Sequence, residues 1–271
     1  MGRFGWIVVL LVVAGAVFWW RGGGKATPIA QAVAQSRVNT TISAADATEA
    51  RITISRGAMA KGALNLVIPA GTLIHSPVEG GQRLMTATAV TVRLGADEPS
   101  KTVTVETYCL DQFGLQPTSA DSLSFDPPAS EDATGGTGPA RDLVDCLAPS
   151  KATHAARQFA VWMVAGGYLD RSQDDARDAI RRAYRETLGT EARAMMRGPA
   201  RDRLAQAMPG LTSSQLDDAV DRYVQRRLGA KLDARAEKMT ADDLTAFGSA
   251  DVRAAIDACG HKTADLPFFR I

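Results

Sequence analysis

The sequence predicts an α+β protein with an N-terminal membrane helix, an antiparallel β-sandwich and a C-terminal helical bundle. Three observations lead to this fold class. Residues 4–20 carry no charge. Residues 50–125 alternate apolar and polar side chains with a period of two, as strands with one buried face do. After residue 150 the apolar positions recur every three or four residues, which is typical of amphipathic helices.

The uncharged segment 4–20 spans about 25 Å as a helix, the short end of what a bilayer requires. Tryptophans lie near both of its ends, where membrane interfaces favour them. We therefore expect an uncleaved signal-anchor, with the bulk of the chain extracytoplasmic in the cell envelope or periplasm. The alternative is a signal peptide followed by secretion to an extracellular or periplasmic space, for which the A-x-A pattern at residues 30–32 is distant.

Changes in composition divide the chain into four parts. Residues 1–21 are the anchor or signal segment, and residues 22–45 are small and polar, as a flexible tether would be. Residues 46–150 form the predicted sandwich, which includes a mobile loop at 126–140 that lacks any large apolar residue. Residues 151–271 form the predicted helical domain.

The predicted helices have sequence signals at their ends. Ser172 begins a helix, and Asp175 stands three residues later, where a capping box requires an acid. Gly189 and Gly229 stand where glycine commonly ends a helix. We therefore expect separate helices at residues 153–164, 172–188, 190–208, 212–228, 241–247 and 250–259.

The charge distribution excludes a dedicated nucleic-acid binder. Residues 38–150 hold 7 basic and 13 acidic residues, whereas residues 151–271 hold 20 basic and 17 acidic residues. Acids thus nearly balance the arginines of the helical part, and no strongly basic surface is expected.

No catalytic, cofactor or metal motif stands out in the sequence. His75, His154 and His261 have no second ligand at a metal-binding spacing. Phosphate-cradling glycine loops and serine-hydrolase motifs are also missing from the sequence. These observations predict a protein that is not an enzyme and that needs no cofactor.

The three cysteines leave the disulfide pairing open. In an oxidising compartment two of them are expected to pair. Cys109 and Cys146 are favoured because they flank the same loop, and the cross-link would stabilise the fold by about 3–4 kcal/mol. A bond from Cys146 to Cys259 would instead join the start of the helical part to its end.

Three segments in order resemble exported bacterial surface domains of the thioester (TQXA) type: Leu64–Gly71, Tyr108–Asp111 and Arg157–Trp162. The resemblance covers residues 64–162. It implies that Cys109 and Gln158 would form an internal thioester able to trap a nucleophile. The sequence departs from the family pattern at Arg157, where the family has threonine.

Together these observations predict a membrane-anchored envelope protein, attached through residues 4–20, that acts as a non-enzymatic module binding another protein. The alternative function is covalent or hydrolytic chemistry centred on Cys109 and Gln158.

Overall fold

A computed structural model describes residues 26–45, 48–125 and 138–270, and these residues divide into two compact units. The sheet unit comprises residues 26–108 and 116–125. The helical unit comprises residues 109–115 and 138–270. The short segment 109–115 thus belongs to the helical unit, although its sequence neighbours on both sides belong to the sheet unit.

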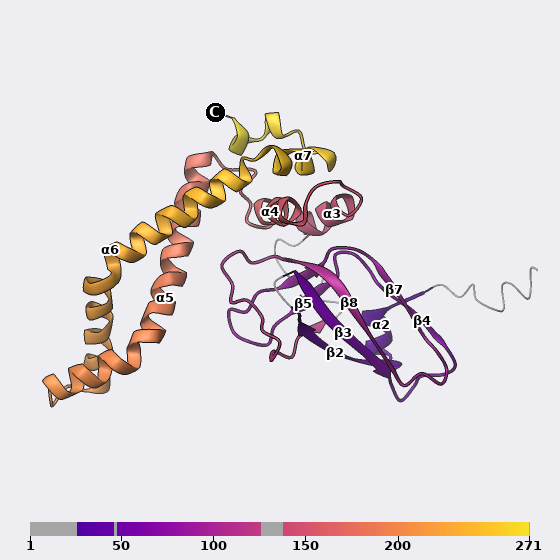
Figure 1. The fold of residues 1–271 in the computed structure, drawn as a ribbon, viewed down its shortest axis with the longest axis horizontal. Helices are drawn as coiled ribbons and strands as arrows, with labels where there is room; N and C mark the ends of the chain where they lie inside the picture. The colour runs from indigo at the N-terminus through magenta and orange to yellow at the C-terminus, as the bar shows by residue number, and fades with distance from the viewer. Residues whose placement is uncertain (1–25, 46–47, 126–137, 271) are drawn as a thin grey trace, which may run out of the picture. The chain divides into compact units, whose positions relative to one another are not determined.

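The sheet unit is built from short strands and one short helix (Figure 1). Alternation of buried and exposed positions along β3 and β4 agrees with the expected period of two. The elements are β1 (Thr27–Pro28), α2 (Ile29–Ala34), β2 (Val38–Ala44), β3 (Glu49–Arg56), β4 (Leu64–Ile68), β5 (Leu73–His75), β6 (Leu84–Thr86), β7 (Val90–Leu94), β8 (Ser100–Cys109) and β9 (Ser124–Phe125).

The larger sheet nearly closes on itself. It has six strands in the order β2-β3-β8-β6-β5-β9, and a smaller sheet has the order β1-β4-β7. Ile42 of β2 pairs with Leu123, which precedes β9, so the two outer strands of the larger sheet come together. Closure removes most of the unpaired edge that an open sheet would present.

The predicted fold class is therefore wrong. The protein is α+β as expected, but its antiparallel sheet is nearly closed rather than one half of a sandwich. Across the residues that the structure describes, no helix has both the length and the apolar character needed to cross a membrane. The segment 4–20, where the membrane helix was predicted, lies outside the described residues.

The predicted tether at 22–45 is also wrong where it is described. Residues 27–44 form β1, α2 and β2. Ile29 and Ala32 of α2, and Val38 and Ile42 of β2, are buried in the sheet unit. Burial of these side chains offsets the entropy of ordering a segment whose small and polar residues suggested a linker.

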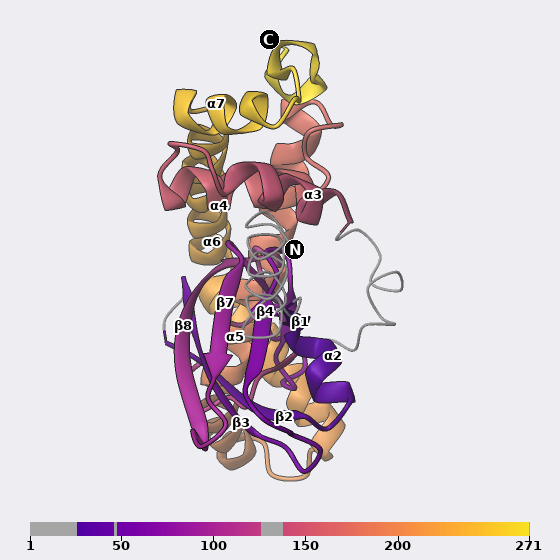
Figure 2. The ribbon, with the colours of Figure 1, turned by 90° about the vertical axis from the view of Figure 1, so that its right-hand side faces the viewer.

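The helical unit consists of a compact base and a long hairpin (Figure 1). The base comprises α3 (Gly138–Leu147), α4 (His154–Ala165), α7 (Ala250–Ala258) and two short 3-10 helices, η2 (Thr263–Asp265) and η3 (Pro267–Phe269). In Figure 2, α3 and α4 lie beneath α7, and all three pack against one another. The hairpin comprises α5 (Gln173–Ala207) and α6 (Ser213–Phe247), which lie side by side.

The boundary between the two parts lies before α3 rather than at residue 150. Cys146 lies within α3, and residues 138–140 of the predicted mobile loop begin this helix. The rest of that loop, residues 126–137, lies outside the described residues.

The predicted N-cap at Ser172 is confirmed, because its hydroxyl accepts a hydrogen bond from the backbone amide of Asp175. Thr153, where a helix was expected to begin, caps α4 in the same way by accepting from the backbone amide of Ala156. Each bond satisfies an amide that has no partner within its own helix.

The predicted stops at Gly189 and Gly229 are wrong, because α5 and α6 each run through them for 35 residues. The two glycines line one hollow of about 470 Å³ between the helices, so they lie at the same level of the hairpin. Side-chain packing along the hairpin outweighs a glycine penalty of about 1 kcal/mol at each position. Both helices also bend along their length (Figure 1).

Replacing Gly189 by alanine is expected to raise the free energy of unfolding by about 0.5–1 kcal/mol. An added methyl group there would meet only the Arg193 side chain, at an ordinary 3.7 Å. Gly229→Ala should gain less, since its methyl would lie 3.0 Å from the Gln225 amide and that side chain must shift. Urea unfolding followed by circular dichroism at the helical band measures both. A loss of stability in Gly189→Ala would contradict the continuous helix.

Candidate functional site

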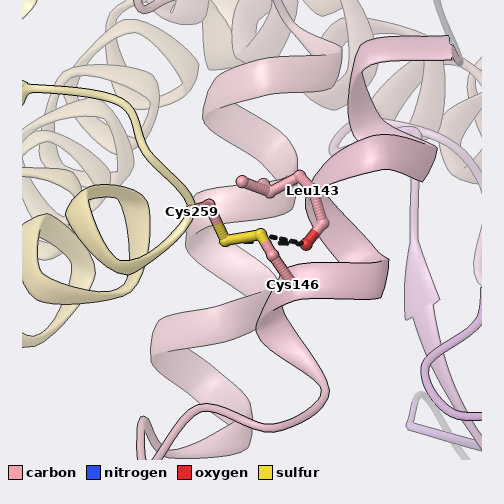
Figure 3. The surroundings of a disulfide bond; sticks show 3 residues. All are labelled: Leu143, Cys146 and Cys259. Carbon is pink, nitrogen blue, oxygen red and sulfur yellow. Dashed lines mark hydrogen bonds between the residues drawn. A yellow bond between two sulfur atoms is a disulfide. The ribbon is translucent and has the colours of Figure 1, made fainter.

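The disulfide of the protein joins Cys146 of α3 to Cys259, the residue that follows α7 (Figure 3). Their Cα atoms are 5.4 Å apart, and the bond closes a loop across 113 positions of sequence. The Leu143 carbonyl oxygen lies 2.9 Å from the Cys146 sulfur and 3.7 Å from the Cys259 sulfur (Figure 3). The favoured pairing of Cys109 with Cys146 is therefore wrong, because α3 and α7 pack together and bring the more distant cysteine to Cys146.

Cys146→Ser and Cys259→Ser are expected to lower the free energy of unfolding equally, by up to about 5 kcal/mol, because each frees a very long loop in the unfolded chain. Cys109→Ala should cost less, about 1 kcal/mol, since it only removes a small buried group. Urea titrations of the three oxidised variants test this pattern. Matching losses in the Cys109 and Cys146 variants, with a silent Cys259 variant, would restore the other pairing.

Cys109 is a buried free thiol at the end of β8. The Gln158 side chain of α4 is hydrogen-bonded to the Cys109 backbone in both directions. Its Nε2 donates to the Cys109 carbonyl at 2.8 Å, and its Oε1 accepts from the Cys109 amide at 2.9 Å. The structure thus brings together the two residues that the thioester resemblance singles out, with the carboxamide acting as an extra backbone partner for the strand end.

The Cys109 thiol is a poor nucleophile in this setting. Burial, and to a smaller extent the negative charge of Asp111, raises the pKa of Cys109 to about 11. At neutral pH the reactive thiolate is therefore a very minor form.

A polar cluster of four residues lies next along the same segment. Asp243 of α6 accepts hydrogen bonds on one carboxylate oxygen from the Gln112 amide at 2.6 Å and from the Tyr184 hydroxyl at 2.5 Å. The Tyr168 hydroxyl donates to the Gln112 side-chain oxygen at 3.3 Å. Phe113 packs edge-on against the Tyr184 ring, with 4.9 Å between centroids. These contacts hold segment 109–115 to the helices.

Burial dominates the electrostatics of this cluster. It raises the pKa of Asp243 despite the two donated hydrogen bonds, which act in the opposite direction. Burial likewise raises the pKa of Tyr168 to about 12 and, with the Asp243 hydrogen bond, raises the pKa of Tyr184 further. Both phenols therefore stay protonated at neutral pH and act as donors rather than bases.

Because the folded chain holds the Asp243 proton more tightly than the unfolded chain does, the free energy of unfolding is expected to fall as pH rises from about 4 through the raised folded pKa. Asp243→Asn should remove this part of the pH dependence, since it keeps an acceptor oxygen but cannot ionise. Urea midpoints between pH 4 and 7 would measure it. Asp242→Asn, at the exposed neighbour, is the control and should keep most of the slope.

The sequence did not predict this cluster. Its one signal is that Asp243 stands on the inward stripe of α6, between the buried Thr240 and Phe247. Gln112 and Tyr168 gave no signal, since their contacts with α6 and with each other join residues more than 50 positions apart.

The distal part of the hairpin, residues 190–232, forms an arm with a narrow core. Four buried residues from α5 and α6 alone make this core, and partly buried neighbours extend it: Ala192, Ala200, Val220 and Val224, then Met196, Leu204, Tyr223, Leu228 and Leu232. Met195 is 72% exposed, Met208 50% and Leu211 38%. The arm therefore presents large apolar side chains to solvent on α5, at the end of α5 and in the connecting turn.

No histidine in the described part of the chain belongs to a group of metal-ligand side chains. His75 shares a hydrogen bond with Ser124 at 3.0 Å. Among the residues that the structure describes, no group of three or more His, Cys, Asp or Glu side chains is placed to hold a metal ion.

Comparisons with models of protein families, with curated proteins and with solved structures each found no match to this chain.

Proposed function

We propose that this chain is a non-enzymatic, extracytoplasmic module that binds another protein through the hairpin arm. The observation that carries the proposal is the exposure of Met195, Met208 and Leu211 on a two-helix arm whose core is only two helices thick. Single exposed apolar residues are normal on a protein surface, whereas several on one extended element are typical of interaction sites.

The ion pairs along the hairpin also favour a binding role over a purely structural one. Ion pairs between α5 and α6 are found nearer the base, where Arg185 meets Asp233 at 2.8 Å and Arg181 meets Glu237 at 3.5 Å. Further along, a looser pair joins Arg201 to Asp217 at 3.8 Å. Such exposed pairs add little to the free energy of unfolding. A stabilising role therefore does not explain these charges, and a binding role is favoured.

The disulfide supports an extracytoplasmic location, since such bonds persist in oxidising compartments and are rare in the cytosol. The location can be tested on intact cells that produce Met59→Cys. Met59 is 62% exposed in the sheet unit. We expect this variant to react with a thiol reagent that does not cross the plasma membrane, whereas the unmodified chain, with its buried Cys109, should stay unlabelled. Labelling only after lysis would contradict the location.

The binding role can be tested in cells with a photo-cross-linking amino acid placed at Met195 or Met208, and at Met59 as the control. We expect a cross-link to one other protein from an arm position, and none to that protein from Met59. Failure of both arm positions to cross-link to any protein would overturn the proposal.

A second candidate function is an internal thioester between Cys109 and Gln158. The bidentate contact between the Gln158 carboxamide and the Cys109 backbone favours it. In this reaction the Cys109 sulfur would bond to the Gln158 side-chain carbonyl carbon, and the amide nitrogen would leave as ammonia with the thiol proton. The raised thiol pKa disfavours the attack, so we place this candidate second.

Intact-protein mass separates the two candidates. The disulfide alone lowers the mass of the chain by about 2 Da, whereas a thioester would remove about 17 Da more, and methylamine would restore mass there. We expect only the smaller loss, and a Gln158→Ala variant with an unchanged disulfide mass signature. The larger loss, absent in both Gln158→Ala and Cys109→Ala, would establish the thioester instead.

A further inference from the structure

The tip of the arm carries a groove of about 610 Å³ between α5 and α6. Its apolar lining comes from the last turns of α5, from the connecting turn and from the first turns of α6: Leu204, Met208, Leu211, Ala219 and Tyr223. Met208 and Leu211 are the most exposed of the large aliphatic side chains here. Water therefore contacts apolar surface that a bound chain would bury with a favourable free energy.

Arginines flank this groove. Arg222 and Arg226 of α6 line it, and both are exposed. Arg227 donates to the Tyr223 hydroxyl at 3.4 Å, and with Arg203 of α5 it lowers the pKa of that phenol. Within the described ranges none of these four arginines has a carboxylate within ion-pair distance.

We propose that this groove binds an amphipathic helical segment of a partner protein, with apolar side chains on the groove floor and acidic side chains against Arg222 and Arg226. This inference rests on the proposed protein-binding function and names the partner's chemistry and the docking site.

The geometry of α6 sets the spacing of the acids. Arg222 and Arg226 are four residues apart, so their side chains leave the same face of the helix about 6 Å apart along its axis. Acids at i and i+4 on a docked helix have the same separation. An apolar stripe beside such acids is the pattern by which helices bind grooves between helices.

A partner segment fits the charges better than two other occupants. A second copy docked groove to groove would bring its own arginines against these, which is unfavourable. A uniformly anionic membrane surface would also meet Asp218, an acid that lines the same groove. A discrete segment can place its acids at the arginines and avoid Asp218.

The test uses the full-length chain, immobilised by a C-terminal tag, and three probes. The first is a synthetic Leu/Glu peptide about 18 residues long with leucine on one helical face. The second is the same peptide with lysine for every glutamate. The third is vesicles of phosphatidylglycerol. We expect the acidic peptide to bind at least about tenfold more tightly than the basic one, and more weakly as salt rises.

Matched variants locate the binding. Arg222→Glu with Arg226→Glu should reverse the preference between the peptides. Arg182→Glu with Lys238→Glu makes the same charge change at exposed positions nearer the base and should leave it unchanged. Met208→Ser should weaken acidic-peptide binding several-fold without altering the helical circular dichroism, since the side chain is half exposed.

Equal binding of the two peptides, or a preference that the control pair alters as much as the groove pair, would overturn the inference. Binding of vesicles that is lost in Arg222→Glu with Arg226→Glu, without peptide binding, would assign the groove to a membrane surface instead. Self-association lost in the same variant would assign it to a second copy. If the groove assignment fails in any of these ways, a cross-link from Met195 or Met208 to another protein in cells would still support the proposed function.

Discussion

The C-terminal end of α6 is the point on which the helical unit depends. Phe247 is fully buried there and contacts rings from three other segments: Phe159 of α4, Tyr168 and Phe268 of η3. One turn earlier, Asp243 binds Gln112 and Tyr184. A single helix end thus joins α4, α5, the chain's C-terminal turns and segment 109–115. Large aromatic rings suit this task because each buries much apolar area at a low entropic cost.

The same arrangement explains why the arm can be long and thin. The base has contacts of its own, in the Phe247 cluster and in the disulfide between α3 and the end of α7. The hairpin keeps Gly189, Gly229 and Pro199 in its helices, each of which weakens a helix. A domain that only needed stability would gain from losing these residues and from covering its exposed methionines.

Local features were predictable from the sequence, and long-range ones were not. Helix starts at Thr153 and Ser172 follow from hydrogen bonds made within four residues. The alternation of apolar and polar residues runs on without a break through residues 84–94, but this segment divides into β6 and β7, which lie in different sheets. The cysteine pairing failed for the same reason. Sequence proximity favoured Cys109, whereas the packing of α3 against α7 decided for Cys259.

The contact between Gln158 and Cys109 has two interpretations, one as a reactive pair and one as a structural pair. The Gln158 carboxamide meets the Cys109 backbone as a neighbouring strand would, and it does so where β8 leaves the sheet unit and its own ladder ends. A buried strand end needs such a partner, because an amide and a carbonyl left without one cost stability. This need alone accounts for a glutamine at position 158 and a small side chain at 109. Burial also raises the pKa of the Cys109 thiol, so it does not activate the sulfur. This structural role is sufficient to explain the contact between Gln158 and Cys109.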